Sequence, residues 1–236
     1  MIVSLTIVRY PKIGVPFALL AMALHRLPMH SQKGCSFWQL LGSGRKGTFD
    51  LYPDWQQWAV LACWDDRKSF DRFYEQSFIS KWWKFFRTEK WTMLCEPLQS
   101  HGTWNGREPF NVPEQVGYQG PLIVLTRATV KFKRLKTFWA HANIVSNILN
   151  NAKGLIVSFG IGEMPVYKQS TFSIWENVDD MKAFAYQSPE HIEVVRKSKE
   201  ESWHKEELFA RLKPIAAFGT LHHADPLKGL ITFDEL

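Results

Sequence analysis

The sequence contains eight histidines, and one of them, His191, lies in a context suited to binding a metal or a haem iron. Ser188-Pro189-Glu190 has the form of a helix start, with Ser at the N-cap, Pro at the first helical position and an acid in the first turn. His191 then takes the third helical position, one turn before Val195. The positive end of a helix disfavours imidazolium, and a neutral imidazole in apolar surroundings is the form that ligates iron. The alternative is a capped, partly exposed helical histidine, which the local sequence alone favours.

The sequence lacks the motifs of several other classes of enzyme. The sequence has no Gly-x-Ser-x-Gly elbow, P-loop, HExxH or catalytic-cysteine signature, and no two histidines have the i, i+4 spacing of metal ligands. The three cysteines (Cys35, Cys63 and Cys95) are far apart, which argues against a disulfide framework and a zinc site and predicts a reducing, cytoplasmic setting. The net charge of +6 is scattered among acids, so we expect no nucleic-acid partner.

The elements that position His191 belong to an internal repeat. The segment from Trp64 to Ser77 resembles the segment from Trp175 to Ser188, with an offset of 111 residues throughout. Upstream, residues 41–44 resemble 159–162, and downstream residues 101–104 resemble 218–221, with offsets of 118 and 117. At offset 111 the counterpart of His191 is Ser80, which indicates that only one half carries a cofactor.

Each half predicts the order βαββαβ. In the first half we expect strands at residues 2–8, 58–64 and 91–99 and a helix at 15–26. In the second half we expect strands at residues 122–132, 171–175 and 215–221 and a helix at 135–150. One such unit makes a four-stranded sheet with helices on one face, and the other face needs cover. We therefore predict an α+β fold in which tandem ferredoxin-like βαββαβ repeats form a single-chain pseudo-dimeric α/β barrel. The predicted parts are residues 1–104, a linker at 105–120, residues 121–221 with the cofactor site, and a tail at 222–236.

Aromatic residues are abundant, with 17 Phe, 11 Trp and 6 Tyr, and most tryptophans precede residue 92. The excess predicts a heavily packed first half or the wall of a substrate tunnel. Residues 13–27 are apolar but too short to span a bilayer, and we interpret them as a buried or interfacial helix.

Several ordered segments resemble the spheroidene monooxygenase family of carotenoid biosynthesis, the acyclic carotenoid 2-ketolases. They include Phe37-Trp-Gln-Leu-Leu-Gly-Ser-Gly44, Gly102-Thr-Trp-Asn-Gly106, Leu125-Thr-Arg-Ala128, Gly160-Ile-Gly-Glu163, Thr171-Phe-Ser-Ile-Trp175 and Glu206-Glu-Leu-Phe-Ala-Arg211. The resemblance covers nearly the whole chain except the tail after Leu221. The predicted fold also resembles dimeric α/β-barrel haem proteins, including chlorite dismutases, dye-decolourising peroxidases and aldoxime dehydratases.

The resemblance implies a haem-dependent monooxygenase that hydroxylates and then ketolates an acyclic carotenoid at C-2. It implies haem b as cofactor and His191 as the iron ligand, because a histidine from the C-terminal half binds iron in those folds. It also implies an electron donor such as a ferredoxin, because the sequence has no flavin or nicotinamide motif. Carotenoids reside in membranes, so peripheral membrane contact through residues 13–27 is expected, and a homodimer is compatible.

Four further residues are candidates for the site. Arg127, on the first strand of the second half, could polarise iron-bound oxygen or hold a haem propionate, or it could be an ordinary strand residue. Glu163 could relay protons, although a surface turn acid is the simpler interpretation. Val195 should pack beside the cofactor. Arg211 could anchor a propionate or pair with Glu207 four residues earlier, and we favour the pair.

Three rival functions remain open at this point. The same fold could support haem-dependent aldoxime dehydration or peroxidation. The chain could bind haem or carotenoid without turnover. A cofactor-free monooxygenase would fit if no haem binds.

Overall fold

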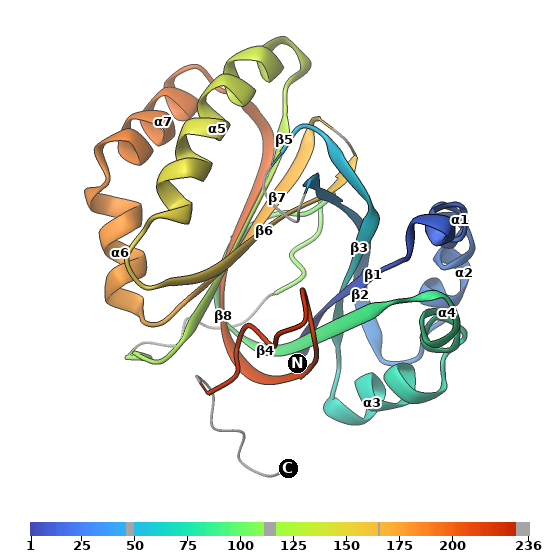
Figure 1. Cartoon of the computed structure of the whole chain (residues 1–236). Coiled ribbons are helices and arrows are strands. Elements are labelled where there is room, and N and C mark those ends of the chain that lie inside the picture. The colour runs from blue at the N-terminus through green and yellow to red at the C-terminus, as the bar shows by residue number, and fades with distance from the viewer. Residues whose placement is uncertain (46–49, 111–116, 165, 230–236) are drawn as a thin grey trace. The chain divides into compact units, whose positions relative to one another are not determined.

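The computed structural model describes residues 1–45, 50–110, 117–164 and 166–229 (Figure 1). The predicted linker at 105–120 and tail at 222–236 therefore lie partly outside the described residues. Eight strands are hydrogen-bonded in the order β1-β3-β2-β6-β7-β5-β8-β4, which closes into a barrel. This order confirms the predicted α+β class with tandem βαββαβ repeats.

The elements of the first repeat follow the predicted order. They are β1 (Ile2–Arg9), α1 (Val15–Leu24), α2 (Arg26–His30), β2 (Cys35–Gly44), β3 (Pro53–Trp64), α3 (Arg67–Gln76), α4 (Phe78–Phe86) and β4 (Glu89–Gly102), with a 3-10 turn at Lys12–Gly14. The helix expected over residues 15–26 is two helices, because the chain turns at His25. Side-chain caps start the later helices: Asp66 accepts from the Ser69 N–H at 2.8 Å and Ser77 from the Ser80 N–H at 3.0 Å.

The second repeat has the same plan. Its elements are β5 (Leu122–Val130), α5 (Leu135–Asn150), β6 (Leu155–Met164), β7 (Lys168–Trp175), α6 (Val178–Gln187), α7 (Pro189–Glu200) and β8 (His204–Gly219), with a 3-10 turn at Phe132–Arg134. Helices α5, α6 and α7 cover one face of these strands (Figure 1). The strand expected over 122–132 ends at Val130, and the strand expected over 215–221 is the last part of the much longer β8.

Corresponding residues of the two repeats make corresponding contacts. Strand β1 pairs with β3 so that Ile2 lies opposite Trp64, and β5 pairs with β7 so that Leu122 lies opposite Trp175. Gly102 and Gly219 both have positive φ angles, 86° and 83°. A Cβ at either glycine would lie within 2.2 Å of a backbone carbonyl oxygen, so only glycine fits these turns.

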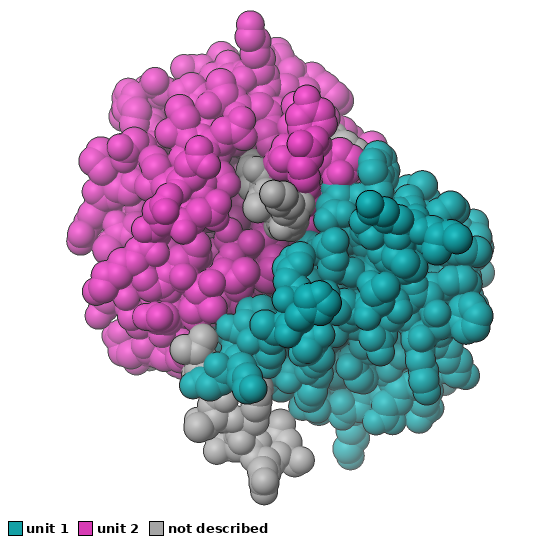
Figure 2. Space-filling model, viewed as in Figure 1, with its two compact units in different colours: residues 1–42, 54–97, 214–236 teal, residues 43–53, 98–213 magenta. Residues whose placement is uncertain are grey.

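The chain forms two compact units that do not coincide with the two repeats (Figure 2). Unit 1 comprises residues 1–42, 54–97 and 214–236, and unit 2 comprises residues 43–53 and 98–213. The long strands β4 and β8 each contribute residues to both units. The described part of the predicted tail belongs to unit 1, where Leu227 is fully buried and Asp225 accepts a hydrogen bond from Trp91 Nε1 at 2.9 Å.

Each unit has its own apolar core. The core of unit 1 is aromatic and includes Trp64, Phe70, Phe73 and Trp83. The core cluster of unit 2 is smaller and includes Leu122, Leu149, Trp175 and Met181. Cys63 and Cys95 are buried free thiols.

Candidate functional site

Unit 2 contains a cavity of about 430 Å³ between its helices and its sheet. Helix α5 contributes Phe138, Ala142, Val145 and Leu149, and helix α7 contributes His191, Val194, Val195, Ser198 and Lys199. The sheet contributes Thr126, Ala128, Gln169, Thr171 and Phe209, among others. A mostly apolar cavity with a few polar groups is the usual form of a site for a small ligand or cofactor.

His191 is held in this cavity with a defined tautomer. It lies at the third position of α7, as predicted, and its Nδ1 is 3.0 Å from the carbonyl oxygen of Ala185. Because a carbonyl can only accept, Nδ1 carries the proton and Nε2 keeps its lone pair. Burial lowers the pKa of His191 below its ordinary value, against the opposing effect of the Ala185 carbonyl. The imidazole is therefore neutral, and its Nε2 lone pair could ligate a metal.

The first repeat has the same local contact without a histidine. Ser80 lies 111 residues before His191, and Tyr74 lies 111 residues before Ala185. The Ser80 hydroxyl donates to the Tyr74 carbonyl, just as the imidazole donates to the Ala185 carbonyl. The backbone of the repeat thus supplies an acceptor in both halves, and only the second half uses it to orient a potential metal ligand.

The cavity also has a counterpart in unit 1, where it is almost filled. A space of about 10 Å³ remains there, lined by residues that correspond to the lining of the large cavity. Four of the corresponding positions carry a bulkier side chain in unit 1: Trp83 replaces Val194, Trp58 replaces Gln169, Leu40 replaces Ser158 and Met22 replaces Ala142. The aromatic excess of the first half therefore fills the space that the second half leaves open.

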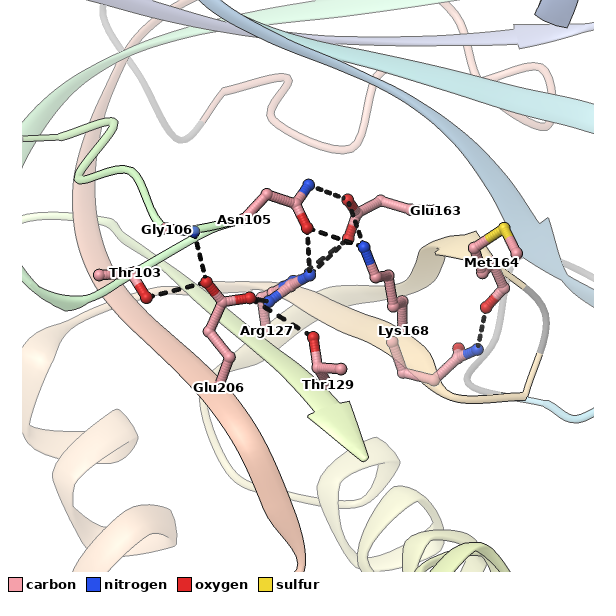
Figure 3. Close-up of polar contacts among 10 residues, drawn as sticks. Thr103, Asn105, Gly106, Arg127, Thr129, Glu163, Met164, Lys168 and Glu206 are labelled. Carbon is pink, nitrogen blue, oxygen red and sulfur yellow. Dashed lines mark hydrogen bonds and ion pairs between the residues drawn. The ribbon is translucent and has the colours of Figure 1, made fainter. Parts of the chain in front are cut away.

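Arg127 and Glu163 form an ion pair (Figure 3). Arg127 and its neighbours in β5, Thr126 and Ala128, all lie along the cavity wall. Because successive side chains of a strand alternate, the Arg127 guanidinium lies on the opposite face of the sheet. It is fully buried there and pairs with Glu163 at 2.8 Å and with Glu206. The Arg127 guanidinium is thus neutralised by Glu163 and Glu206 on the other face of β5, although the residue itself forms part of the cavity wall.

Further polar groups complete this network around Arg127. Asn105 donates to Glu163 at 2.6 Å and accepts from Lys168 at 2.8 Å. Glu206 accepts from Thr103 Oγ1 at 2.9 Å and from the Gly106 N–H at 2.7 Å. Both carboxylates are therefore balanced by the cations Arg127 and Lys168, and the network ties β5, β6, β7 and β8 to the segment after β4.

The Glu206 carboxylate makes stability sensitive to acid. Burial alone raises the pKa of Glu206, but hydrogen bonds from the Gly106 N–H, Arg127 and Thr103 outweigh it and lower the pKa to about 2. Its stabilising effect is therefore complete above its ordinary pKa of 4.5 and is lost as the pH falls from there toward 2. We expect Glu206→Gln to flatten the acid limb of a plot of unfolding free energy against pH between those values. An acid limb identical in wild type and variant would contradict this expectation.

The predicted pairing of Arg211 with Glu207 is wrong. That pairing requires a helix, whereas both residues lie in β8, where Leu208, Ala210 and Leu212 are buried at every second position. Four residues along a strand span about 13 Å. Glu207 instead bonds to His204, and the Arg211 guanidinium lies 3.5 Å from Tyr186 Oη. Arg211 Nε is buried without a hydrogen-bond partner among the described residues.

Sequence reasoning missed two polar residues of the cavity wall, His101 and His204. The His101 ring stacks on Phe209 with ring centroids 4.9 Å apart. His204 Nδ1 bonds to Ser198 Oγ at 3.3 Å and to Glu207, and the His204 bond lowers the pKa of Glu207. The period-two burial from Leu208 to Leu212 was the available signal, since it places this segment on a strand beside the cavity.

The cavity residues fit a haem. His191 offers a neutral imidazole nitrogen, the apolar walls suit a flat macrocycle, and Lys199 is a cation suited to a propionate. Within the described ranges, no group of three or more His, Cys, Asp or Glu side chains could hold a metal ion. A haem iron needs only axial ligands from the protein, so a single well-oriented histidine is sufficient.

The fold is a closed barrel that resembles the fold of aldoxime dehydratases. A crystal structure of an aldoxime dehydratase matches with a TM-score of 0.62 and 10% identity over 90% of this chain and 80% of that one. The aldoxime dehydratase OxdRE, in complex with butyraldoxime, matches with a TM-score of 0.60 and 13% identity, over 90% of this chain and 79% of that one. At these identities the likeness is one of fold.

The chain belongs to the spheroidene monooxygenase family, a family of oxidoreductases. It is 33% identical to spheroidene monooxygenase of Rhodobacter capsulatus over 230 residues, which cover 96% of this chain and 95% of that protein. It is 34% identical to the Cereibacter sphaeroides enzyme over 212 residues, covering 89% of this chain but 65% of that longer protein. The resemblance seen in the sequence motifs is thus confirmed.

No protein-family model matches the chain. In the described part of the chain, no helix combines the length and the apolar character needed to cross a membrane.

Proposed function

We propose that the chain is a haem-dependent monooxygenase that acts on a hydrophobic acyclic carotenoid of the spheroidene type, at C-2. The observation that carries the proposal is His191, whose Nδ1–H bond to Ala185 leaves Nε2 free beside a large apolar cavity. The names of the Rhodobacter and Cereibacter relatives support the substrate class. Haem b, when bound, supplies the activation of dioxygen.

The reaction balances with an external donor. Each round inserts one oxygen atom into a C–H bond and reduces the other to water, which consumes two electrons and two protons. Two rounds at one carbon give a geminal diol that loses water to form the ketone. The sequence contains no motif for a flavin or nicotinamide, so we propose a ferredoxin-type donor.

In this proposal, residues of the chain hold the haem and orient it in the cavity. His191 Nε2 ligates the iron, and Val194 and Val195 exclude water beside it. Arg211 lies two residues beyond the cavity-lining Phe209, on the same face of β8, and its free Nε binds a propionate. For Arg127 and Glu163 we propose a positioning role, because their ion pair secures β5 and β6 from the opposite face of the sheet.

The turnover test uses haemin-reconstituted protein, spheroidene, oxygen and reduced ferredoxin. We expect a product one oxygen atom heavier, followed by the ketone, and neither without the donor. Protein that binds haemin, dehydrates an aldoxime and leaves the carotenoid unchanged would instead assign the chain to the chemistry of its structural neighbours. Protein that binds neither haemin nor carotenoid would overturn the proposal.

The filled counterpart in unit 1 suggests how to close the cavity. Val194→Trp introduces the residue that the first repeat carries at position 83, so the side chain has room in the open cavity. We expect haemin affinity to fall roughly tenfold or more while the melting temperature is retained or rises. Spectroscopic titration and thermal unfolding measure the two effects.

The reciprocal variant is the matched control. Trp83→Val opens a cavity in the packed core of unit 1, where Trp83 is 2% exposed. It should lower stability by about 3 kcal/mol or more and leave haemin affinity unchanged. Equal haemin affinity in Val194→Trp and wild type would place the haem elsewhere.

A further inference from the structure

Helix α1 has an unusual composition for a surface helix. Its ten residues, Val15–Leu24, contain no charged or hydrogen-bonding side chain. Only Ala18 and Ala21 of the helix are buried, whereas Phe17, Leu20 and Leu24 are each more than 40% exposed. A helix that is apolar on all sides is normally enclosed by protein or by lipid. The outer face of α1 therefore lacks the cover that its composition calls for.

The apolar surface continues onto the neighbouring helices. Phe17 of α1 stacks on Phe86 of α4 with ring centroids 4.5 Å apart, and the three helices α1, α2 and α4 lie together (Figure 1). Ile13, Leu27 and Phe85 are the most exposed members, at 86%, 76% and 82%. We call this surface the α1–α4 patch; its members are Ile13, Phe17, Leu20, Leu24, Leu27, Phe78 and Phe85.

The charges around the patch have one sign. Residues 1–49 contain no Asp or Glu, and neither do residues 76–88, so α1, α2 and α4 carry no acid. Basic side chains border the patch instead: Lys12 and Arg26 beside α1, and Lys81, Lys84 and Arg87 on and after α4. A cationic rim around exposed large apolar side chains is the pattern of a helix that lies in the interface of an anionic bilayer.

The second repeat provides an internal comparison. The positions that correspond to Ile13, Leu27 and Phe85 carry Lys133, Asn147 and Arg196. Arg196 is held on the surface of α7 by ion pairs with Glu193 and Glu200. At these three positions the same elements therefore carry polar or charged side chains in one repeat and exposed apolar side chains in the other, so the fold does not require apolar residues there.

We propose that the α1–α4 patch docks the protein on an anionic lipid bilayer, with the apolar side chains inserted at the headgroup level and the basic rim against lipid phosphates. The inference deepens the proposed function, because a carotenoid substrate resides in the bilayer. Docking itself requires neither haem nor turnover, so it can be tested apart from them.

The test is flotation of the wild-type chain with liposomes of phosphatidylcholine alone or mixed with phosphatidylglycerol. The variant I13Q/L27N/F85Q replaces three exposed apolar side chains without changing the charge, and F132Q/I144N/I192Q does the same on the exposed surface of the second repeat. We expect wild type and the second variant to float with anionic liposomes. The first variant should bind anionic liposomes at least roughly tenfold more weakly than wild type, and wild-type binding should fall in high salt.

Three outcomes would overturn the proposal. Equal flotation of both variants would place membrane contact elsewhere. No flotation of folded wild-type protein would exclude lipid as the occupant. Dimeric wild type that does not float and becomes monomeric in I13Q/L27N/F85Q would assign the patch to a second copy of the chain. Failure of carotenoid turnover with intact flotation would contradict the proposed function and leave the docking surface standing.

Discussion

Replacing His191 by Ala should abolish the Soret band of haemin-reconstituted protein and weaken haemin binding roughly hundredfold or more. The tautomer of the His191 imidazole is fixed for ligation, since Nδ1 donates to Ala185 at 3.0 Å. The measurement is a haemin titration followed by absorption. Added imidazole should restore the band in His191→Ala, because a free imidazole can occupy the space that the side chain leaves.

The repeat provides the control for this variant. Ser80→Ala removes the side chain that makes the equivalent hydrogen bond in the first repeat, and it should leave the spectrum unchanged. The pH dependence adds a second readout. Burial lowers the pKa of His191 below its ordinary value of 6.5, so the imidazole stays neutral at a pH where a free histidine would already be protonated. Haemin affinity should therefore fall only when the pH drops below this lowered pKa and the ring protonates. An unaltered Soret band in His191→Ala would remove it as the ligand.

The architecture was largely predictable because duplication leaves a periodic signal. Trp64 and Trp175 recur with the residues around them, and each sits at the end of a strand opposite the first residue of its repeat's opening strand. The period-two pattern of β8 was harder to detect, because Glu206, Glu207 and Arg211 also fit a charged helix surface. Leu208, Ala210 and Leu212 are buried at every second position, which shows that this segment is a strand.

The site was predictable only in part. The N-terminal helix signal placed His191 correctly, since Pro189 acts locally at the helix start, although the Ser188 side chain makes no capping hydrogen bond. The direction of the Arg127 side chain depends on which face of β5 meets the helices, and that depends on pairing with β7 and β8. The partners of Arg127 come from segments 36 and 79 residues away, Glu163 and Glu206. No local pattern reports contacts at such separations.

Arg127→Met should be the most destabilising single change in unit 2, costing about 3–5 kcal/mol. The Arg127 side chain is fully buried, and its loss leaves Glu163, 9% exposed, and Glu206, 19% exposed, without their shared cation. Equilibrium unfolding in urea measures the cost. The acid limb should also change, because the pKa of Glu206 rises toward its ordinary value once the Arg127 hydrogen bond is gone.

A triple variant separates two causes of the instability of Arg127→Met: the unpaired carboxylates of Glu163 and Glu206, and the lost packing of the Arg127 side chain. Arg127→Met combined with Glu163→Gln and Glu206→Gln removes both negative charges along with the cation, and it should recover most of the lost stability. Recovery would show that Arg127 acts by balancing buried charge behind the cavity wall. If the triple variant is no more stable than Arg127→Met alone, the cost lies in packing against Trp104, whose ring centre is 5.5 Å from the guanidinium carbon. Haemin affinity measured on the folded triple variant then tests the positioning role, because a wall secured only by this network should bind haemin more weakly once the network is neutral.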